Sequence, residues 1–427
     1  MHRPQDKERA ILVGVVLSGM TRHQEEESLN ELALLADTAG AEVVDYIVQD
    51  RHRVDSATFV GTGKVHEIAR RSTELRANLI IFDTELSPVQ IKNLNYEIHQ
   101  KIMDRSGLIL DIFAKRARTR EAQIQVELAQ LQYLFPRLTR HWTHLSRQEA
   151  GIGTRGPGET QLEVDRRAVR KRMERLKMEL RKIEGQRVVR RKKRQDFKKV
   201  ALVGYTNAGK SSLLNALSNA EAFVENRLFA TLDTTIRSLY LQTQQKVLLI
   251  DTVGFIRKLP PHLVATFRST LEETIEADIL LHVVDVSHSQ FEEQMGTVQE
   301  VLRELDIHNK PTLAVFNKVD LLDDNRIIPL LRSRFPRAVF TSAVKGIGLT
   351  ILKQEIVELM NEEQIDSEIQ IPAKETKAIA VIHEWAKVLS EEYENGMVRI
   401  QFRTTPQYVN RINKWIEKMD GTANTYL

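Results

Sequence analysis

One stretch of the sequence has the spacing of a phosphate-binding loop, because the apolar run Val200–Val203 is followed by G-x-x-x-x-G-K-S. Glycines let such a loop curl until successive N–H groups point at a phosphate chain. A helix should follow, and its N-terminus adds partial positive charge. Lys210 would then reach the β- and γ-phosphates, and the Ser211 hydroxyl would bind Mg²⁺. The predicted loop residues are Gly204, Tyr205, Thr206, Asn207, Ala208, Gly209, Lys210 and Ser211.

Two further strings follow in the order that a guanine-nucleotide switch requires. The strand Lys246–Ile250 ends at Asp251, which would hold Mg²⁺ through water, and the Gly254 amide would meet the γ-phosphate. The strand Pro311–Phe316 runs into N-K-x-D, and the Asp320 carboxylate can accept the ring N–H and the exocyclic amino protons of guanine. Adenine lacks that donor pair, so the string selects GTP over ATP. The residues predicted here are Asp251, Thr252, Val253, Gly254, Asn317, Lys318, Val319 and Asp320.

A last strand, Ala338–Thr341, leads to a loop that should support the base, formed by Ser342, Ala343 and Val344. Each of these strings is weak evidence alone, and the phosphate loop alone could be a chance glycine turn. Together they stand in order, each at the carboxyl end of a strand, where parallel sheets bind ligands. The sequence therefore predicts a binding site for GTP or GDP and Mg²⁺ in a Ras-like P-loop domain.

A switch threonine is expected between the first helix and second strand of this domain, closing over Mg²⁺ when the γ-phosphate is present. We choose Thr231, with Thr234 and Thr235 as alternatives. The predicted catalytic residues are Lys210, Thr231 and Gly254. The segment residues predicted at the nucleotide are Phe229, Ala230, Thr231, Leu232 and Asp233.

The residue after Gly254 is Phe255, where many small GTPases have a glutamine that orients the attacking water. A phenyl ring can neither donate nor accept that hydrogen bond. The sequence therefore predicts slow intrinsic hydrolysis, with the water positioned by another part of the chain or by a partner. Equal rates for the isolated protein and for its complex would contradict this prediction.

The composition is that of a globular protein, and 427 residues suggest about two to four domains. The absence of cysteine excludes disulfides, thiolate metal sites and cysteine nucleophiles, and it fits a reducing compartment. Arg3, Lys7 and Arg9 precede the apolar run Ala10–Leu17, which could resemble a signal peptide. A first β-strand is the better interpretation, because charged residues resume at once. No run has the length of a bilayer span, so we expect a cytoplasmic protein without membrane association.

Residues 1–118 are predicted to form an N-terminal α/β domain with a parallel sheet. The expected strands are Ile11–Leu17, Glu42–Val48 and Leu79–Phe82, and the expected helices are Glu25–Ala36, Lys64–Ser72 and Val89–His99. Ser87 should cap the last of these helices, with Pro88 at its first position. The string Phe59–Lys64 resembles half of a phosphate loop. We interpret it as a strand–turn–helix corner, with contact to a phosphate or RNA as the alternative.

Residues 119–197 are predicted to form an arm of two long helices, Glu121–Leu134 and 161–194, with a glycine-rich joint at 150–160. Between Arg166 and Lys199 there are 17 Lys or Arg and 4 Asp or Glu, a net charge of +13 in a chain whose total is +4. Four acids cannot pair seventeen bases, so a polyanion is the expected partner, with an anionic membrane surface as the weaker alternative. Interleaved aromatic residues are absent, which predicts salt-dependent backbone contacts without DNA sequence readout. The residues predicted to contact RNA are Arg155, Arg190, Arg191, Lys192, Lys193 and Arg194.

Residues 198–362 should form the GTPase domain and residues 363–427 a small C-terminal α/β domain, so the whole chain is a multidomain α/β protein. In the C-terminal part, Ile369–Pro372 is interpreted as a linker. Ala378–Ile382 and Met397–Phe402 are predicted strands, and Pro406–Lys418 is a predicted helix.

This order of domains resembles the HflX-type ribosome-associated GTPases. The glycine-rich joint Gly151–Glu163 and the strings Asp104–Phe113 and Thr252–Ile256 match that family, and the similarity covers essentially the full chain. The resemblance implies Mg²⁺ ligation by Ser211 and Thr231. It also implies GTP-dependent binding to the large ribosomal subunit and its rRNA, hydrolysis stimulated there, and splitting of stalled or idle ribosomes, often under stress.

Phe255 fits the hydrophobic substitution of the family, whereas Ser342–Val344 departs from its commoner S-A-K form. Backbone amides support the base at that loop, so the departure affects only nucleotide affinity. Two other functions remain open: an RNA helicase or remodeller that uses the same site, and an assembly factor that docks without splitting subunits. Dissociation of ribosomes on GTP addition, unwinding without ribosomes and capture of immature subunits distinguish the three. The free protein is expected to be a monomer.

Overall fold

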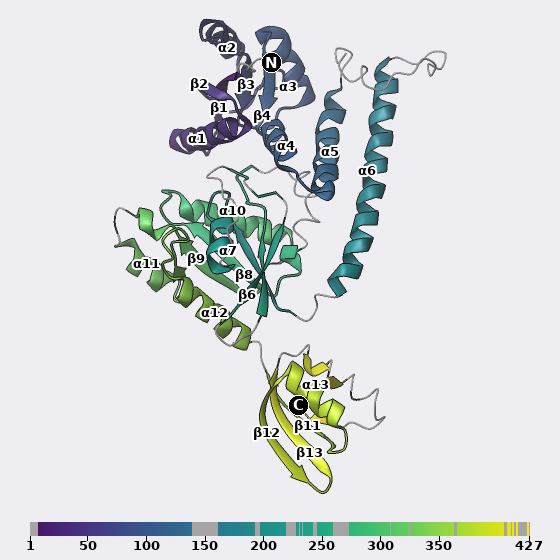
Figure 1. Ribbon diagram of the computed structural model, residues 1–427. Helices are drawn as coiled ribbons and strands as arrows, with labels where there is room; N and C mark the ends of the chain where they lie inside the picture. The colour runs from purple at the N-terminus through teal and green to yellow at the C-terminus, as the bar shows by residue number, and fades with distance from the viewer. Residues whose placement is uncertain are drawn as a thin grey trace, which may run out of the picture. The chain divides into compact units, whose positions relative to one another are not determined.

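The computed structural model divides the chain into two compact units, Met1–Tyr240 with Gln244–Leu349, and Leu241–Thr243 with Thr350–Leu427 (Figure 1). The division into four domains, with boundaries after residues 118, 197 and 362, therefore stays a prediction. Within the described part of the chain, no helix combines the length and the apolarity needed to cross a bilayer. The structure describes residues 7–138, 161–192, 197–218, 228–229, 231–232, 234–241, 246–258, 273–307, 309–322, 324, 326–362, 365–404, 408–410, 412–413, 416 and 425–426.

The first unit begins with a parallel four-stranded sheet of order β2-β1-β3-β4. Alternate residues of β1 pack into hydrophobic clusters on opposite faces of the sheet. Ala10 and Leu12 pack with α1 and α4, whereas Ile11 and Val13 pack with α2 and α3. Such a sheet is covered by helices on both faces, as predicted for an α/β domain. Its elements are β1 (Arg9–Val16), α1 (Arg22–Ala39), β2 (Glu42–Asp50), α2 (Thr62–Glu74), β3 (Leu79–Phe82), α3 (Pro88–Ile98), β4 (Lys101–Asp104) and α4 (Arg105–Arg116).

The start of α3 confirms the predicted cap. The Ser87 hydroxyl accepts the N–H of Gln90, the Gln90 side chain accepts the N–H of Ser87, and Pro88 takes the first helical position. The sequence prediction did not include β4 and α4. β4 is short and only partly buried, and α4 is buried on most of its circumference, so neither element shows the alternation or the amphipathic period by which it could be recognised.

Two helices, α5 (Arg120–Leu134) and α6 (Gln161–Lys192), run side by side, as Figure 1 shows. Ile124 and Leu128 of α5 pack against Leu176 of α6. The described part of α6 thus has an apolar stripe at helical spacing, which the many charged residues of this segment obscure in the sequence. After α5 the chain forms a 3₁₀ turn (η1, Phe135–Arg137), so Pro136 ends the helix rather than kinking it. The stripe of α6 consists of Val169, Met173, Leu176, Leu180 and Ile183.

The remainder of the first unit is a six-stranded sheet of order β10-β9-β8-β5-β7-β6. All neighbouring strands are parallel except β6 and β7, which are antiparallel. The loops after β5, β7 and β9 therefore meet at one edge of the sheet, where such folds bind ligands. Its elements are β5 (Lys199–Gly204), α7 (Lys210–Ser218), β6 (Thr235–Tyr240), β7 (Lys246–Asp251), β8 (Ile279–Asp285), α10 (Phe291–Glu304), β9 (Thr312–Asn317), η3 (Val319–Leu321), α11 (Ile327–Arg334) and β10 (Val339–Phe340).

The second unit contains an antiparallel sheet of order β12-β13-β11-β14, preceded by α12 (Leu349–Glu362). Residues 408–410 and 412–413 are helical, so strands and helices follow the order of a ferredoxin-like fold. The rest of the predicted helix 406–418, apart from residue 416, lies outside the described residues. The other elements are β11 (Ile365–Pro372), α13 (Thr376–Trp385), β12 (Lys387–Glu394), β13 (Met397–Thr404) and β14 (Thr425–Tyr426).

Two sequence predictions for this unit are wrong. The expected linker Ile369–Pro372 is the end of β11, where Ile369 and Ile371 face the core. The expected strand Ala378–Ile382 is the middle of α13, because Ala378 and Ile382 lie four residues apart on the helix face that packs against the sheet. The strand predicted at Met397–Phe402 is confirmed as β13.

Candidate functional site

The predicted phosphate loop connects β5 to α7 at the carboxyl edge of the six-stranded sheet. A Cβ added at Gly204 would lie 2.2 Å from the Val283 carbonyl oxygen, and one at Gly209 would lie 2.2 Å from Asn317 Nδ2. Gly209 also has a φ of +93°, a conformation that side chains disfavour. Close packing against β8 and the loop after β9 therefore explains both glycines.

Lys210 begins α7 with its ammonium buried beneath the loop. Its Nζ donates hydrogen bonds to the carbonyl oxygens of Gly204 at 3.1 Å and Tyr205 at 2.8 Å. Burial lowers the pKa of Lys210 to about 8, opposed by the charge of Asp251. Below it on β8, burial and the Lys210 charge lower the pKa of His282 to about 4, so His282 is a neutral core residue at pH 7. The loop thus holds a single buried cation.

The three predicted Mg²⁺ ligands lie together. Ser211 Oγ donates to Asp251 Oδ2 at 2.5 Å and lies 2.7 Å from Thr231 Oγ1. Asp251 is buried, which raises its pKa, and among the described residues its Oδ1 has no hydrogen-bond partner. Two hydroxyls and a carboxylate are oxygen ligands of the kind that Mg²⁺ prefers, and an ion there would satisfy the orphan oxygen. The donor set therefore fits Mg²⁺.

The predicted base loops are joined to the phosphate loop through Asn317. Its Nδ2 donates to the Ala208 carbonyl at 3.0 Å, and its Oδ1 accepts the Ala343 N–H at 3.1 Å. Lys318 adopts a φ of +64° and its Nζ lies 2.6 Å from Asp285 Oδ2. Asp320, in η3, is exposed and free to meet a base. The structure thus gathers all the described base-loop residues at one edge: Asn317, Lys318, Val319, Asp320, Ser342, Ala343 and Val344.

The segment between α7 and β6 contributes fewer side chains than predicted. Phe229 is buried against Phe113, with ring centroids 4.7 Å apart, and its N–H donates to Thr206 Oγ1 at 2.9 Å. Leu232 is also buried, so both are core side chains. Among the described residues of this segment, Thr231 brings its hydroxyl 2.7 Å from Ser211 Oγ. The alternative Thr235 pairs with Asp251 through the β6–β7 ladder. Ala230 and Asp233 lie outside the described residues.

The DxxG loop after β7 is packed tightly against the phosphate loop. Thr252 is fully buried and its hydroxyl donates to the Leu202 carbonyl at 2.6 Å, while Val253 is also buried. A Cβ added at Gly254 would lie 2.7 Å from Thr206 Cα and 3.0 Å from Lys210 Nζ. Only glycine fits there, so Gly254 packs directly on Thr206 and close to the buried Lys210 ammonium.

Phe255 is a structural residue of the core. Its side chain is 2% exposed, its N–H donates to the Gly204 carbonyl at 3.1 Å, and its carbonyl accepts the Thr206 N–H at 2.7 Å. The ring is therefore enclosed in the hydrophobic core. The side chain of a glutamine at position 255 would also lie in the core, where it could not orient the attacking water.

We expect Phe255→Gln to leave the intrinsic kcat for GTP unchanged. Loss of apolar contacts and burial of an amide should lower the free energy of unfolding by about 2–4 kcal/mol. Phosphate release by the isolated protein and urea unfolding measure the two effects, with Phe255→Leu as the apolar control. A tenfold or greater rise in kcat for Phe255→Gln alone would contradict the assignment.

The basic arm presents residues that were not individually predicted. Arg155, Lys193 and Arg194 lie outside the described residues, as do the side chains of Arg190, Arg191 and Lys192. In the described part, Arg172 faces α5 and binds Glu127 at 2.6 and 2.8 Å. The helical spacing of the apolar stripe would have located the opposite, basic face. Its exposed members are Arg166, Arg167, Arg170, Lys171, Arg175, Lys177, Arg181 and Lys182.

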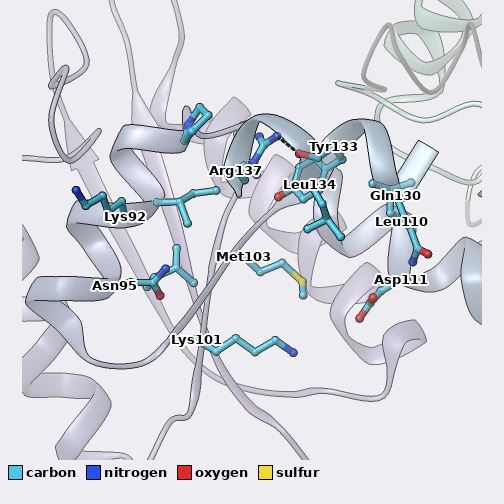
Figure 2. Close-up of a pocket in the computed structure, with 14 residues that line it drawn as sticks. Lys92, Asn95, Lys101, Met103, Leu110, Asp111, Gln130, Tyr133, Leu134 and Arg137 are labelled. Carbon is cyan, nitrogen blue, oxygen red and sulfur yellow. Dashed lines mark hydrogen bonds between the residues drawn. The ribbon is translucent and has the colours of Figure 1, made fainter. Parts of the chain in front are cut away.

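A cavity of about 450 Å³ lies in the N-terminal region among α3, β4, α4, α5 and η1 (Figure 2). Its lining includes the apolar side chains of Met103 and Leu134 and the polar side chains of Lys92, Asn95 and Lys101 (Figure 2). The half loop predicted at Phe59–Lys64 does not line it. That string instead starts α2, with Gly61 as the cap and Lys64 paired with Glu67 at 2.7 Å, so it is a corner.

The fold and the converging loops define a P-loop GTPase. Three family models match: GTP-binding GTPase N-terminal over 26–114, GTP-binding GTPase Middle Region over 116–194, and 50S ribosome-binding GTPase over 199–318. GTPase HflX of Caldanaerobacter subterraneus subsp. tengcongensis is 45% identical over 96% of this chain and 94% of its own length. GTPase HflX of Escherichia coli K12 is 42% identical over 93% of each chain.

The chain therefore belongs to the HflX family of GTPases, and it binds GTP and hydrolyses it to GDP and phosphate. Among solved structures, SsGBP in complex with GDP is 25% identical, with a TM-score of 0.46 over 82% of this chain and 98% of that chain.

Proposed function

We propose that this GTPase binds the large ribosomal subunit in its GTP form and dissociates stalled or idle ribosomes in the cytoplasm, with hydrolysis stimulated there. The observation that carries the proposal is one chain with both a GTP switch site and an exposed basic face on α6. The match of residues 199–318 to the 50S ribosome-binding GTPase model supports the same partner.

In this proposal each loop of the site has one task. Lys210 binds the β- and γ-phosphates, the Gly254 amide meets the γ-phosphate, and Asp320 accepts the guanine N–H groups. Ser211, Thr231 and Asp251 hold Mg²⁺, which would neutralise phosphate charge. Loss of the γ-phosphate would release Thr231 and its segment, which makes the site a switch.

The basic face of α6 supplies affinity for rRNA without reading its sequence. Its side chains are exposed, and the apolar stripe of α6 packs another side of the helix against α5. Contacts of this kind neutralise phosphates and release counterions, so binding weakens steeply with salt. Positive charge is concentrated on this one arm, so a single copy of the protein would bind rRNA through this face.

We expect the triple substitution Lys171→Glu, Arg175→Glu and Lys182→Glu to weaken binding to large subunits about 10²-fold at 0.15 M salt. The slope of the logarithm of the binding constant against the logarithm of the salt concentration should become shallower by about two to three, which is about one unit for each lost phosphate contact. Binding is measured by co-sedimentation with a non-hydrolysable GTP analogue over a salt series.

A second triple variant, Arg53→Glu, Arg76→Glu and Lys92→Glu, makes the same charge change at exposed positions of the N-terminal region. It should retain most of the affinity, and both variants should hydrolyse GTP normally without ribosomes. Equal losses for the two variants would show that net charge, rather than the face of α6, governs binding.

A further inference from the structure

A cluster of buried charges lies in the N-terminal part of the first unit. Arg105, 1% exposed, donates from Nη1 to Asp83 Oδ1 at 2.6 Å and from Nη2 to Glu31. Asp83 also accepts the Ser28 hydroxyl at 2.7 Å, and Glu25 accepts the Val15 N–H at 3.1 Å. Two carboxylates, from Glu31 and Asp83, thus bind one arginine, and Glu25 lies close enough to Asp83 to feel its charge.

Two residues of the GTPase part end on the same carboxylates. Lys258 Nζ contacts Asp83 and lies 3.7 Å from Glu25 Oε2. The Tyr205 hydroxyl donates to Glu31 Oε2 at 2.8 Å and accepts the N–H of Arg257 at 2.9 Å. Tyr205 belongs to the phosphate loop and Lys258 stands four residues after Gly254. The carboxylates of Glu25, Glu31 and Asp83, called the acid cluster here, therefore contact both loops that are predicted to approach the γ-phosphate.

Charge balance makes Lys258 part of the cluster. Burial raises the pKa of Glu25, and the positive charge of Lys258 opposes this rise. Burial alone would also raise the pKa of Asp83, yet Arg105 and Lys258 hold it below its usual value. Removing Lys258 would leave buried carboxylates with less compensating charge.

The loop Gly254–Lys258 is held by backbone hydrogen bonds near its start and by the Lys258 side chain at its end. The backbone of Phe255 is hydrogen-bonded to the backbone of Gly204 and Thr206 in the phosphate loop. Lys258 adopts a φ of +54°, a conformation that residues with a side chain disfavour. Glu31, Tyr205 and Arg257 also line a cavity of about 230 Å³ together with Thr206 and Asn207. Because Gly254 packs directly on Thr206 and Lys210, a small movement of this loop changes the predicted γ-phosphate contacts.

We propose that Lys258 and Tyr205 are positioning residues for GTP hydrolysis, which anchor the loop Gly254–Lys258 to the carboxylates of Glu25, Glu31 and Asp83. Their side chains bind these carboxylates, and by fixing the loop they fix the position of the Gly254 amide. The N-terminal region thereby forms part of the hydrolytic apparatus. This inference concerns the GTPase reaction and does not depend on the ribosomal partner.

The test is GTP hydrolysis by full-length Lys258→Met without ribosomes. We expect kcat to fall about tenfold while KM for GTP stays within about twofold, because the loop is misplaced and the nucleotide contacts are kept. Lys258→Arg should restore most of kcat, since it returns the cation. The matched control is Lys199→Met, which removes a lysine paired with Glu276 at 2.8 Å, away from the nucleotide edge.

Tyr205→Phe provides an independent variant, because it keeps the ring and loses only the bonds to Glu31 and Arg257. It should also lower kcat at constant KM, and the double variant should lose less than the product of the single losses, because both act on one loop. Should Lys258→Met lower the melting temperature, Tyr205→Phe decides the result. An unchanged or raised kcat, a change confined to KM, or failure of Lys258→Arg to restore kcat would overturn the proposal.

Discussion

Replacing Asp320 with asparagine should lower the affinity for GTP about 10³-fold and make xanthosine triphosphate the preferred nucleotide. The carboxylate can accept two N–H groups of guanine, and each charge-assisted hydrogen bond contributes about 1.5–3 kcal/mol. Xanthine has a carbonyl in place of the exocyclic amino group, so an asparagine amide could accept its ring N–H and donate to that carbonyl. Asp320 is exposed, so the fold should not change.

Competition against a fluorescent guanine nucleotide measures both affinities. Asp324→Asn is the matched control, since this exposed carboxylate lies four residues away and pairs with Arg326 at 2.7 Å. It should leave the preference for guanine intact. Retention of GTP affinity by Asp320→Asn would show that another group reads the base.

Replacing Lys210 with alanine should reduce kcat for GTP about 10³-fold, because the ammonium stabilises charge that develops on the phosphate oxygens. The structure predicts that this loss occurs without unfolding. Lys210 is buried and its pKa is lowered to about 8, so the nucleotide-free protein holds an ammonium at a desolvation cost. Its melting temperature without nucleotide should stay the same or rise.

Single-turnover hydrolysis and thermal unfolding measure these two effects. Lys101→Ala, which removes an exposed lysine paired with Glu8 at 2.9 Å, serves as the control and should change neither. A loss of activity accompanied by a large fall in melting temperature would mean that Lys210 supports the fold rather than the reaction.

The nucleotide edge could be predicted because each of its strings follows a buried strand at fixed spacing. Parallel strands bring their carboxyl ends together, so Ser211 and Asp251 meet although 40 residues separate them. Thr231 was chosen among three threonines, and the structure places it 2.7 Å from Ser211. The side chains of Phe229 and Leu232 are buried in the core, which could not be predicted because a loop has no period that separates core residues from exposed ones.

The acid cluster could not be predicted from the sequence. Tyr205 and Glu31 lie 174 residues apart, and Lys258 and Asp83 lie 175 apart, so no local pattern connects them. In the second unit, the short apolar run Ala378–Ile382 fits a strand and a helix equally well. Packing against the sheet decides for the helix, and that packing is a property of the tertiary structure.

Sedimentation of purified ribosomes through sucrose gradients tests the central claim most directly, with this protein and GTP, a non-hydrolysable GTP analogue or GDP. We predict loss of intact ribosomes and co-migration of the protein with large subunits in both triphosphate samples, and neither effect with GDP. Binding to large subunits without loss of intact ribosomes would favour the assembly factor. A protein that remains at the top of the gradient with every nucleotide would contradict the ribosomal function.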